Sequence, residues 1–368
     1  MLLIIGGGLA GGLLSLALKR VGFENFLLVE AGEKFGGNHT WSFHRQDVPD
    51  LLWEVLSPKL KGSWPAHDIL MPKYERRLES SYHSLRSEDF HDLLLTELSQ
   101  RQYRLGEKAN PADFPLVIDT RPLPIESYGP VAYQNFVGLD LYFPDGHGLE
   151  LPRLMDTRVD QKNAYRFIYS LPWDKHRILV EDTRYENTPL GESMSWDEEV
   201  KSYARKEYGG NFRVERREAA ALPLPLTKQM FSTEPDEKTF PFGMRAGFFN
   251  PTTGYSFPQA AQFSVELARA ISADNLSSSY RRLRAQWQKD CAYYFVLNRM
   301  LFGAAQGEER LRIFERFYKL SDDLIHRFYQ GNLKLRDQAR ILVGKPPVSV
   351  KRAVQSLLNS QWMDEKRL

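Results

Sequence analysis

The sequence predicts a mixed α/β (α+β) protein, in which a Rossmann-type nucleotide domain is joined to a strand platform and a helical C-terminal part. Three observations support this prediction. A glycine-rich turn separates an apolar strand from a helix near the start, short strand patterns fill the middle, and the pattern is mostly helical from about residue 259. The chain has 368 residues, which is long enough for two domains that each have a core.

The first unit begins with an apolar strand at 2–5, followed by a glycine-rich turn at 6–11 and a helix at 9–20. A second strand, at 26–29, ends on Glu30. This acidic residue comes about 20 residues after the glycines, where a dinucleotide-binding fold usually holds a ribose hydroxyl. The order of strand, glycines, helix, strand and acid therefore predicts a dinucleotide site.

The individual residues of this turn have separate expected roles. Gly6 permits the tight turn, Gly8 lets a pyrophosphate approach the backbone, and Gly11 lets the helix pack on the strand. Leu9 and Ala10 begin the helix, whose N-terminal dipole is directed at the phosphates. The alternative is a glycine-rich turn in an ordinary βαβ unit.

The apolar start of the chain has two other possible interpretations, a signal peptide and a membrane span. No charge occurs before Lys19, but five glycines interrupt the apolar run. A signal peptide begins with a basic region, and glycine costs about 1 kcal/mol at each site in a helix. The nucleotide turn is therefore the better interpretation.

Local patterns of apolar residues predict the elements of the middle region. A capping-box start followed by apolar residues three and four apart predicts a helix at 87–98. Short runs rich in β-branched and aromatic residues predict strands at 116–119, 132–137, 140–143, 166–170 and 177–183.

A second glycine loop lies at 248–258 and leads into a helix from about residue 259. Two separated glycine loops are typical of a two-domain flavoprotein, in which the second loop closes over the cofactor. We expect four residues of this region to contact the cofactor: Gly247, Asn250, Thr253 and Gly254. Gly37 and His39, in the loop at 35–42, are expected to contact the same cofactor. The nucleotide domain is thus discontinuous, at 1–125 and 240–275, with the strand platform at 126–239 and the helical part at 276–368.

Composition and charge limit the class of protein. A hydrophobic content of 42% and a charged content of 26% are ordinary for a soluble globular chain. The single cysteine, Cys291, excludes an intramolecular disulfide and fits a reducing compartment. From residue 281 onward there are 18 Lys and Arg against 9 Asp and Glu, so this part carries +9 and the rest −7. The basic end predicts an anionic partner surface, and we expect no nucleic-acid partner.

Several long stretches resemble bacterial lycopene β-cyclases, which are flavoproteins of carotenoid synthesis. The resemblance spans nearly the whole chain, and its stretches are GGNHTWSFH at 36–44, MDTRVDQ at 155–161, YRFIYSLP at 165–172, LVEDTRY at 179–185, RAGFFNPTTGYSFP at 245–258, LNRML at 297–301, and ERFYKL with KLRDQARILVGKPP within 315–347.

The resemblance implies reduced FAD, NAD(P)H as its reductant, and lycopene as the substrate. It implies an isomerase, or intramolecular lyase, that closes β-rings at the ends of the polyene without net oxidation. Such an enzyme is cytoplasmic and peripheral on the inner face of the cell membrane. Two rivals are a redox flavoenzyme acting on an apolar substrate, such as a monooxygenase or dehydrogenase, and a non-catalytic carotenoid-binding protein. The oligomeric state is left open.

Ring closure requires a carboxylic acid that apolar surroundings keep protonated, and negative charge near a carbocation. The resemblance places the family's functional glutamate on Glu181, which we expect to be the proton donor. Alternation along a strand puts Asp182 on the opposite face, so we assign Asp182 a supporting role, holding backbone or an arginine. Asp156 is a weaker candidate, with an arginine salt bridge as its structural alternative. His39 and His44 are alternative participants, and no metal-ligand spacing is present.

The chain departs from its relatives at two places. They usually carry a DGRG turn after the strand at 116–119, whereas this chain reads Asp-Thr-Arg-Pro at 119–122. Proline lacks an N–H and fixes φ, so a phosphate or flavin contact there would change. The segment at 100–114 is also too short for the three-stranded meander expected there. Both departures put the tightness of FAD binding, rather than the fold, in question.

The C-terminal part contains a candidate membrane-facing helix. As one helix, residues 310–330 would carry an apolar stripe edged by arginines and lysines, the pattern of a helix that lies at a membrane interface. The alternative is a helix whose stripe packs on the core. Basic residues at 334–336 and 344–347 extend the same character.

Overall fold

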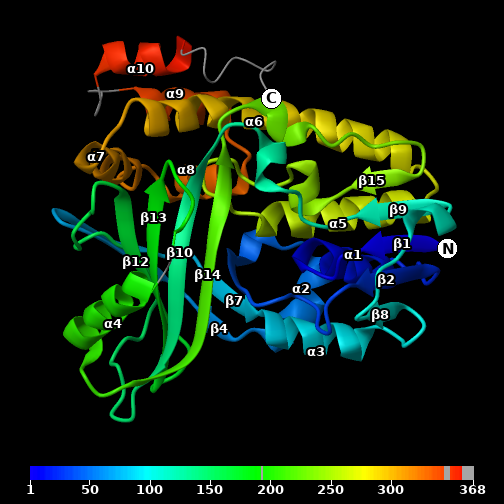
Figure 1. The fold of residues 1–368 in the computed structure, drawn as a ribbon, viewed down its shortest axis with the longest axis horizontal. Helices are drawn as coiled ribbons and strands as arrows, with labels where there is room; N and C mark the ends of the chain where they lie inside the picture. The colour runs from blue at the N-terminus through cyan, green and yellow to red at the C-terminus, as the bar shows by residue number, and fades with distance from the viewer. Residues whose placement is uncertain (192–193, 344–348, 359–368) are drawn as a thin grey trace.

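The computed structural model describes residues 1–191, 194–343 and 349–358, and it confirms the predicted mixed α/β architecture (Figure 1). The N-terminal half of the fold is a parallel sheet of five strands in the order β15-β9-β1-β2-β8. Its bounds are β1 Leu2–Ile5, β2 Phe26–Glu30, β8 Tyr103–Leu105, β9 Leu116–Asp119 and β15 Thr239–Pro241. β1 occupies the centre because its four residues, LLII, are all buried, as expected of a strand covered on both faces.

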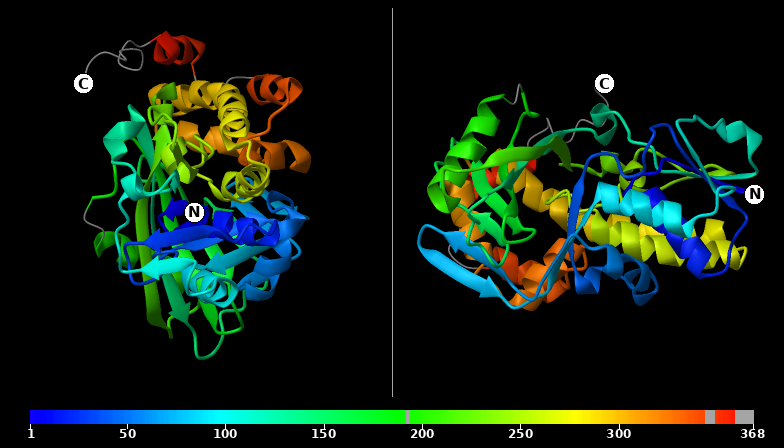
Figure 2. Two further views of the ribbon diagram at one scale, coloured as in Figure 1. Left: turned by 90° about the vertical axis from the view of Figure 1, so that its right-hand side faces the viewer. Right: turned by 90° about the horizontal axis from the view of Figure 1, so that it is seen from below.

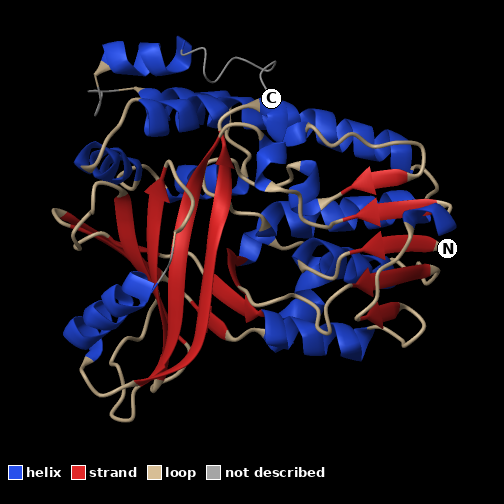
Figure 3. Cartoon of the chain, viewed as in Figure 1, coloured by secondary structure: helices blue, strands red, loops and turns tan. Residues whose placement is uncertain are grey.

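A second sheet of seven strands forms the other half of the molecule (Figure 3). Its order is β14-β10-β13-β12-β11-β5-β6, and it is antiparallel except between β5 and β11. The bounds are β5 His67–Met71, β6 Tyr74–Leu78, β10 Val131–Tyr142, β11 Arg153–Asp156, β12 Tyr165–Pro172, β13 Arg177–Glu186 and β14 Arg213–Pro225. A third sheet, in the order β3-β7-β4, is built from β3 Thr40–His44, β4 Gly62–Trp64 and β7 Tyr82–Arg86.

The helices fall into three groups. Near the parallel sheet lie α1 Leu9–Arg20, α2 Asp50–Leu56, α3 Ser87–Glu97 and α5 Phe257–Ser272, while α4 Met194–Tyr208 covers one face of the seven-stranded sheet. The C-terminal group contains α6 Leu276–Gly303, α7 Glu308–Phe317, α8 Asp322–Gln330, α9 Leu335–Leu342 and α10 Val350–Leu358. α6 runs along the length of the molecule, and the shorter helices gather at one end of it (Figures 1 and 2).

Several predicted elements differ from those observed. The strands expected at 132–137 and 140–143 form the single strand β10, which bulges only between Asp140 and Leu141. The strands β5 and β6, within the segment at 1–125 that was assigned to the nucleotide domain, belong to the seven-stranded sheet. The short segment at 100–114 contributes one strand, β8, to the edge of the parallel sheet.

The single helix expected at 310–330 is wrong, because the segment breaks into α7 and α8. Its apolar stripe packs inward. Five residues of the stripe are buried: Phe314, Phe317, Leu320, Leu324 and Phe328. Phe314 stacks on Tyr165 of β12 with ring centroids 3.8 Å apart. The stripe is therefore core packing against the seven-stranded sheet, and it does not face lipid. The basic residues at 344–347 lie outside the described residues.

Candidate active site between the two sheets

A row of side chains crosses the seven-stranded sheet at the level of Glu181. Gly138 of β10 pairs with Glu181 of β13 on one side and with Glu218 of β14 on the other. Glu181 in turn pairs with Tyr169 of β12. Residues directly opposite one another in an antiparallel sheet project from the same face, so these side chains share one face.

This face borders a cavity of about 630 Å³. The cavity is lined by the seven-stranded sheet, the three-stranded sheet, residues 253–257 and helix α8. Most of its wall is apolar or aromatic, and the residues that matter most here are Tyr82, Phe136, Phe167, Tyr169, Leu179 and Leu222. A site of this size and lining fits an apolar molecule with a few polar groups directed at it.

Glu181 is the acid that the cavity wall presents. Its side chain is partly exposed, but the surface it is exposed to is the cavity. Removal from bulk water raises the pKa of Glu181 to about 8, and the nearby charge of Glu218 acts in the same direction. Thr183 donates a hydrogen bond to Glu181 Oε1 at 2.6 Å, which opposes the increase in part. At neutral pH the carboxyl group is therefore protonated and able to act as an acid.

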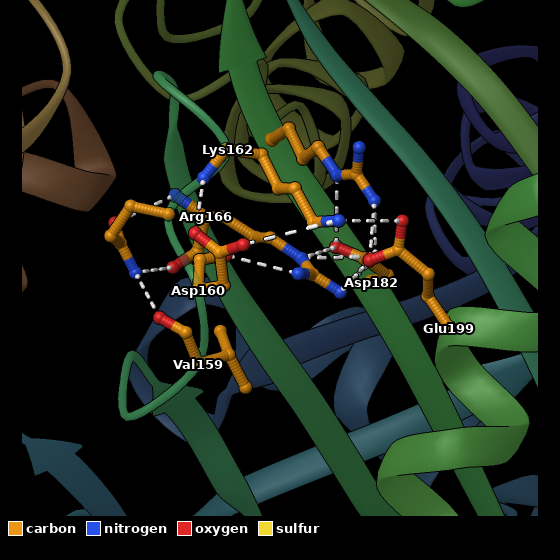
Figure 4. A network of polar contacts seen from close by, with 8 residues as sticks. Val159, Asp160, Lys162, Arg166, Asp182 and Glu199 are labelled. Atoms are coloured by element: carbon orange, nitrogen blue, oxygen red, sulfur yellow. Dashed lines mark hydrogen bonds and ion pairs between the residues drawn. The ribbon is translucent and has the colours of Figure 1, made fainter.

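Asp182 points to the opposite face, as strand alternation predicts. Its carboxylate, fully buried, accepts hydrogen bonds from Arg166 at 2.8 Å and from Arg184 at 2.8 Å. Glu199 of α4 joins both arginines at 2.6 and 3.3 Å, so the charges are paired beneath α4 (Figure 4). Asp182 is therefore a structural anchor between the sheet and α4.

Asp156 forms a salt bridge with Arg158, which is the structural role expected if it is not catalytic. Arg158 donates to both carboxylate oxygens, at 2.9 and 2.8 Å, and Tyr203 of α4 donates at 2.7 Å. These bonds lower the pKa of Asp156 although burial opposes them. The side chain does not border the cavity.

The glycine turn at 6–11 is tight and leaves open space over Gly8. Gly6 adopts φ +100°, and a Cβ on Gly11 would lie 2.0 Å from the carbonyl oxygen of Gly6. A Cβ on Gly8, in contrast, would meet nothing within 4 Å. Among the described residues, no side chain caps the start of α1, where Leu9 and Ala10 lie, and its first turn carries no acid.

Glu30 ends β2 beside this turn. Its Oε2 accepts from the backbone N–H of Gly7 at 2.6 Å, and its Oε1 accepts from that of Gly32 at 2.7 Å. The acid predicted from spacing therefore lies at the glycine turn in space. Thr120 replaces the usual glycine nearby, and its hydroxyl lies 2.9 Å from the carbonyl oxygens of Ile5 and Gly6. The departure at 119–122 thus braces the turn through a side chain.

The second glycine loop divides into two parts. Thr253 and Gly254 border the cavity. Asn250 is fully buried, and its amide donates to the carbonyl of Phe328 at 2.7 Å while its carbonyl accepts from Thr252 at 2.9 Å. Gly247 accepts a bond from the indole of Trp287 at 2.8 Å, behind the loop. The side chain of Asn250 and the backbone carbonyl of Gly247 therefore hold the loop in place, and neither residue lines the cavity.

The histidines lie at different parts of the cavity. His39 borders it next to Trp41, while Gly37, with φ +67°, precedes it in an exposed turn. His44 is grouped with His67 and His326, with ring centroids 5.4 and 4.8 Å from its own. Burial lowers the pKa of His67 to about 3 and that of His326 to about 4. These rings are neutral at pH 7, so they add no positive charge to the cavity.

Sequence reasoning missed Glu218, Tyr82 and Tyr169. Tyr82 and Tyr169 join their hydroxyls at 2.9 Å within the cavity wall. Glu218 was missed because the first half of β14 is strongly charged and gives no apolar alternation. The only hint was the apolar end of the same strand, AAALPLP.

Within the described ranges, no helix is long and apolar enough to cross a membrane. Over the same residues, no group of three or more His, Cys, Asp or Glu could hold a metal ion.

The comparisons with known proteins agree with this geometry. The family model described as "Lycopene cyclase protein" matches residues 2–112 and 106–355. Two relatives called lycopene beta-cyclase, from Pseudescherichia vulneris and Pantoea ananas, are 37% and 34% identical over 97% and 98% of both chains. The solved flavin-dependent halogenase CmlS shares the fold, with a TM-score of 0.58 and 14% identity over 99% of this chain and 77% of its own. The family match and the two relatives show that this chain belongs to the lycopene cyclase proteins.

Proposed function

We propose that this protein closes β-rings at the ends of lycopene by acid catalysis without net oxidation. The observation that carries the proposal is Glu181, a carboxyl group with a pKa of about 8 in the wall of an apolar cavity. A carboxylic acid that stays protonated at neutral pH can donate its proton to an alkene. A water-exposed carboxyl group cannot, because it has already lost its proton at that pH.

The reaction needs three bond changes at each end of the polyene. The O–H bond of Glu181 breaks as a C–H bond forms on the terminal double bond. The next double bond attacks the resulting cation, which closes the six-membered ring. A different C–H bond then breaks, and its electron pair forms the ring double bond, so substrate and product have the same mass.

The aromatic wall suits the cationic stage of this reaction. The faces of Tyr82, Tyr169, Phe136 and Phe167 carry the negative part of the ring quadrupole, which attracts a cation more strongly in a dry site. The same side chains exclude water, which would otherwise capture the cation as an alcohol.

The residues present fit FAD. The open space over Gly8, the uncapped start of α1 at Leu9 and Ala10, and the carboxylate of Glu30 would hold the pyrophosphate and ribose. Thr253, Gly254 and His39 border the cavity where the flavin end would reach. In its reduced, anionic form the cofactor would supply negative charge close to the cation, with NAD(P)H as the proposed reductant.

The test is expression in a bacterium that accumulates lycopene, followed by chromatography and mass analysis of the pigments. We expect γ-carotene and β-carotene, with a mass equal to that of lycopene. Products that differ by two hydrogens or by an oxygen would instead identify a redox flavoenzyme. Unconverted lycopene bound to the purified protein would identify a carotenoid-binding protein.

We further propose that the protein docks on an anionic membrane surface, on the cytoplasmic side, through α9. Lycopene resides in the bilayer, so the enzyme must reach it there. Three apolar residues at the ends of this helix are exposed to solvent. The exposed fractions are 83% for Leu335, 47% for Leu342 and 61% for Val343, which directly follows the helix. Arg336 and Arg340 are exposed beside them, and exposed apolar groups next to basic ones fit a lipid interface.

A further inference from the structure

The cavity wall contains two glutamates, one on each side of a glycine. Gly138 pairs with both Glu181 and Glu218, so the two glutamates flank it on the same face. A Cβ on Gly138 would lie 3.2 Å from Cγ of Glu218 and 3.5 Å from Cβ of Glu181. Cδ1 of Leu179 would also lie 3.2 Å away, so a side chain at position 138 would crowd this part of the cavity wall.

The two glutamates have different partners, which separates their protonation states. Oε2 of Glu218 forms an ion pair with Nη1 of Arg216 at 2.9 Å and accepts a hydrogen bond from the hydroxyl of Thr40 at 3.1 Å. Glu181, in contrast, accepts a hydrogen bond from the neutral hydroxyl of Thr183. Burial raises the pKa of Glu218 as well, but Arg216 and Thr40 oppose that increase, whereas at Glu181 the opposing group is the neutral hydroxyl of Thr183. The cationic partner therefore favours the negative charge on Glu218, and the proton of the pair stays on Glu181.

We propose that Glu218 is the second catalytic carboxylate of this site and accepts the proton that the ring loses after closure. This inference rests on the proposed cyclisation. The proton leaves the Glu181 carboxyl for the alkene, and the C–H bond of the closed ring later breaks as an O–H bond forms on Glu218. The pair then holds one proton as before, and its transfer across Gly138 to Glu181 restores the starting state.

Other groups of the cavity are less suited to accept this proton. Tyr169 and Tyr82 bear hydroxyls whose pKa burial raises, so both stay protonated and are poor bases. His44, His67 and His326 come from β3, β5 and α8, outside the row of side chains that contains Glu181. Among the described residues of the cavity wall, Glu218 combines an arginine partner with a position in the same row as the acid.

The main test is E218Q, which keeps the size of the side chain and removes its charge. The matched control is E215Q on the same strand, because Glu215 pairs with Arg177 and Arg213 away from the cavity. We expect cyclisation by E218Q to fall by about 10²–10⁴-fold, the usual contribution of a positioned base, and E215Q to keep the parental rate. Flavin content and thermal unfolding show whether each variant is folded.

A second readout is the pH–rate profile, which reports whether Glu218 carries its charge beside Glu181. Removal of the charge at position 218 lowers the pKa of Glu181, so the alkaline limb of the remaining activity moves to lower pH. The charged or titratable groups around the pair are the same in both proteins: Arg216, Asp140, Arg86, Glu88, His39, Tyr169 and Asp182. E181Q combined with E218Q should lose no more rate than E181Q alone, because the two groups act as one unit.

If E218Q does not fold, Gly138→Ala decides the question with both carboxyls present. Its methyl group would press on Cγ of Glu218 and Cδ1 of Leu179 at 3.2 Å, so Glu218 must shift relative to Glu181. We therefore expect at least a tenfold loss of rate and the same shift of the alkaline limb. A folded E218Q, or Gly138→Ala, with parental rate and profile overturns the inference. Parental protein that does not convert lycopene overturns the proposed function instead, so the two failures are distinguishable.

Discussion

Glu181 and Asp182 are neighbours in the chain whose surroundings are opposite. One carboxyl group faces an apolar cavity and is kept protonated, and the other is buried between two arginines and is kept charged. The strand causes this difference, because successive side chains alternate between its faces. Each residue therefore has its own testable consequence.

The pH dependence of activity should report Glu181. Because its pKa is raised to about 8, the carboxyl group carries its proton below that pH and loses it above. We expect kcat/KM to be level from about pH 6 to pH 7.5 and to fall tenfold per unit above pH 8. A decline that begins near pH 5, as for an ordinary carboxyl group, would contradict this assignment.

The same group should affect stability in the opposite direction to most acids. The native state keeps a proton that the unfolded chain releases above its ordinary pKa of 4.5. The free energy of unfolding therefore decreases as pH rises from about 4.5 to 8. Glu181→Gln should remove this part of the pH dependence, while cyclisation falls by orders of magnitude.

Asp182→Asn should reduce stability and leave the chemistry of the folded protein intact. Loss of one partner from a buried ion pair costs about 3–5 kcal/mol, because the arginines keep their charge without compensation. The control is Asp68→Asn, whose partner Arg77 is 53% exposed, where pairs contribute about 0–1 kcal/mol. Urea unfolding measures both, and equal losses would contradict the assignment.

At the scale of elements, the C-terminal helices show how an apolar stripe acquires its partner. The apolar stripe of α7 and α8 packs in the same core cluster as β12, whereas the leucines at the two ends of α9 are exposed. Phe314→Ala should destabilise the protein by about 3–5 kcal/mol, because the ring stacks on Tyr165 in the core. Leu335→Ala, at an exposed position, should change stability by less than about 0.5 kcal/mol. If Phe314→Ala unfolds at the parental urea concentration, the stripe does not pack in the core.

The glycine turn can be tested as a unit of strand, turn and helix. Gly8→Val adds a side chain into space that is empty of protein atoms, so the fold should persist. The pyrophosphate would occupy that space, so we expect the purified variant to lose its flavin absorbance. Gly210→Val, which also extends into open space, is the control that keeps flavin. Parental flavin content in Gly8→Val would place the cofactor elsewhere.

At the scale of the whole molecule, the cavity and α9 belong to the same assembly of the seven-stranded sheet and the C-terminal helices. Flotation with liposomes should show binding that increases with anionic lipid and decreases with salt, because each basic group contributes about 1 kcal/mol near such a surface. Arg336→Glu with Arg340→Glu should weaken it, and Arg205→Glu with Lys206→Glu on α4 should have little effect. Equal binding by all three proteins would locate the contact elsewhere.

The sequence by itself determined the parts of this protein whose information is local. The turn at 6–11, the strands at 2–5 and 116–119, and the opposite directions of Glu181 and Asp182 follow from glycine spacing, apolar runs and strand alternation. The family resemblance drew attention to Glu181 among many acids.

The tertiary structure alone decided what depends on contacts between distant segments. Glu218 lies beside Glu181 because β10 pairs with both β13 and β14, and strand pairing cannot be read from one strand. The stripe in α7 and α8 is buried because β12 covers it, and the same pattern on a free helix would face lipid. Local patterns set the shape of each segment, whereas the environment of its side chains is set by the partner that packs on it.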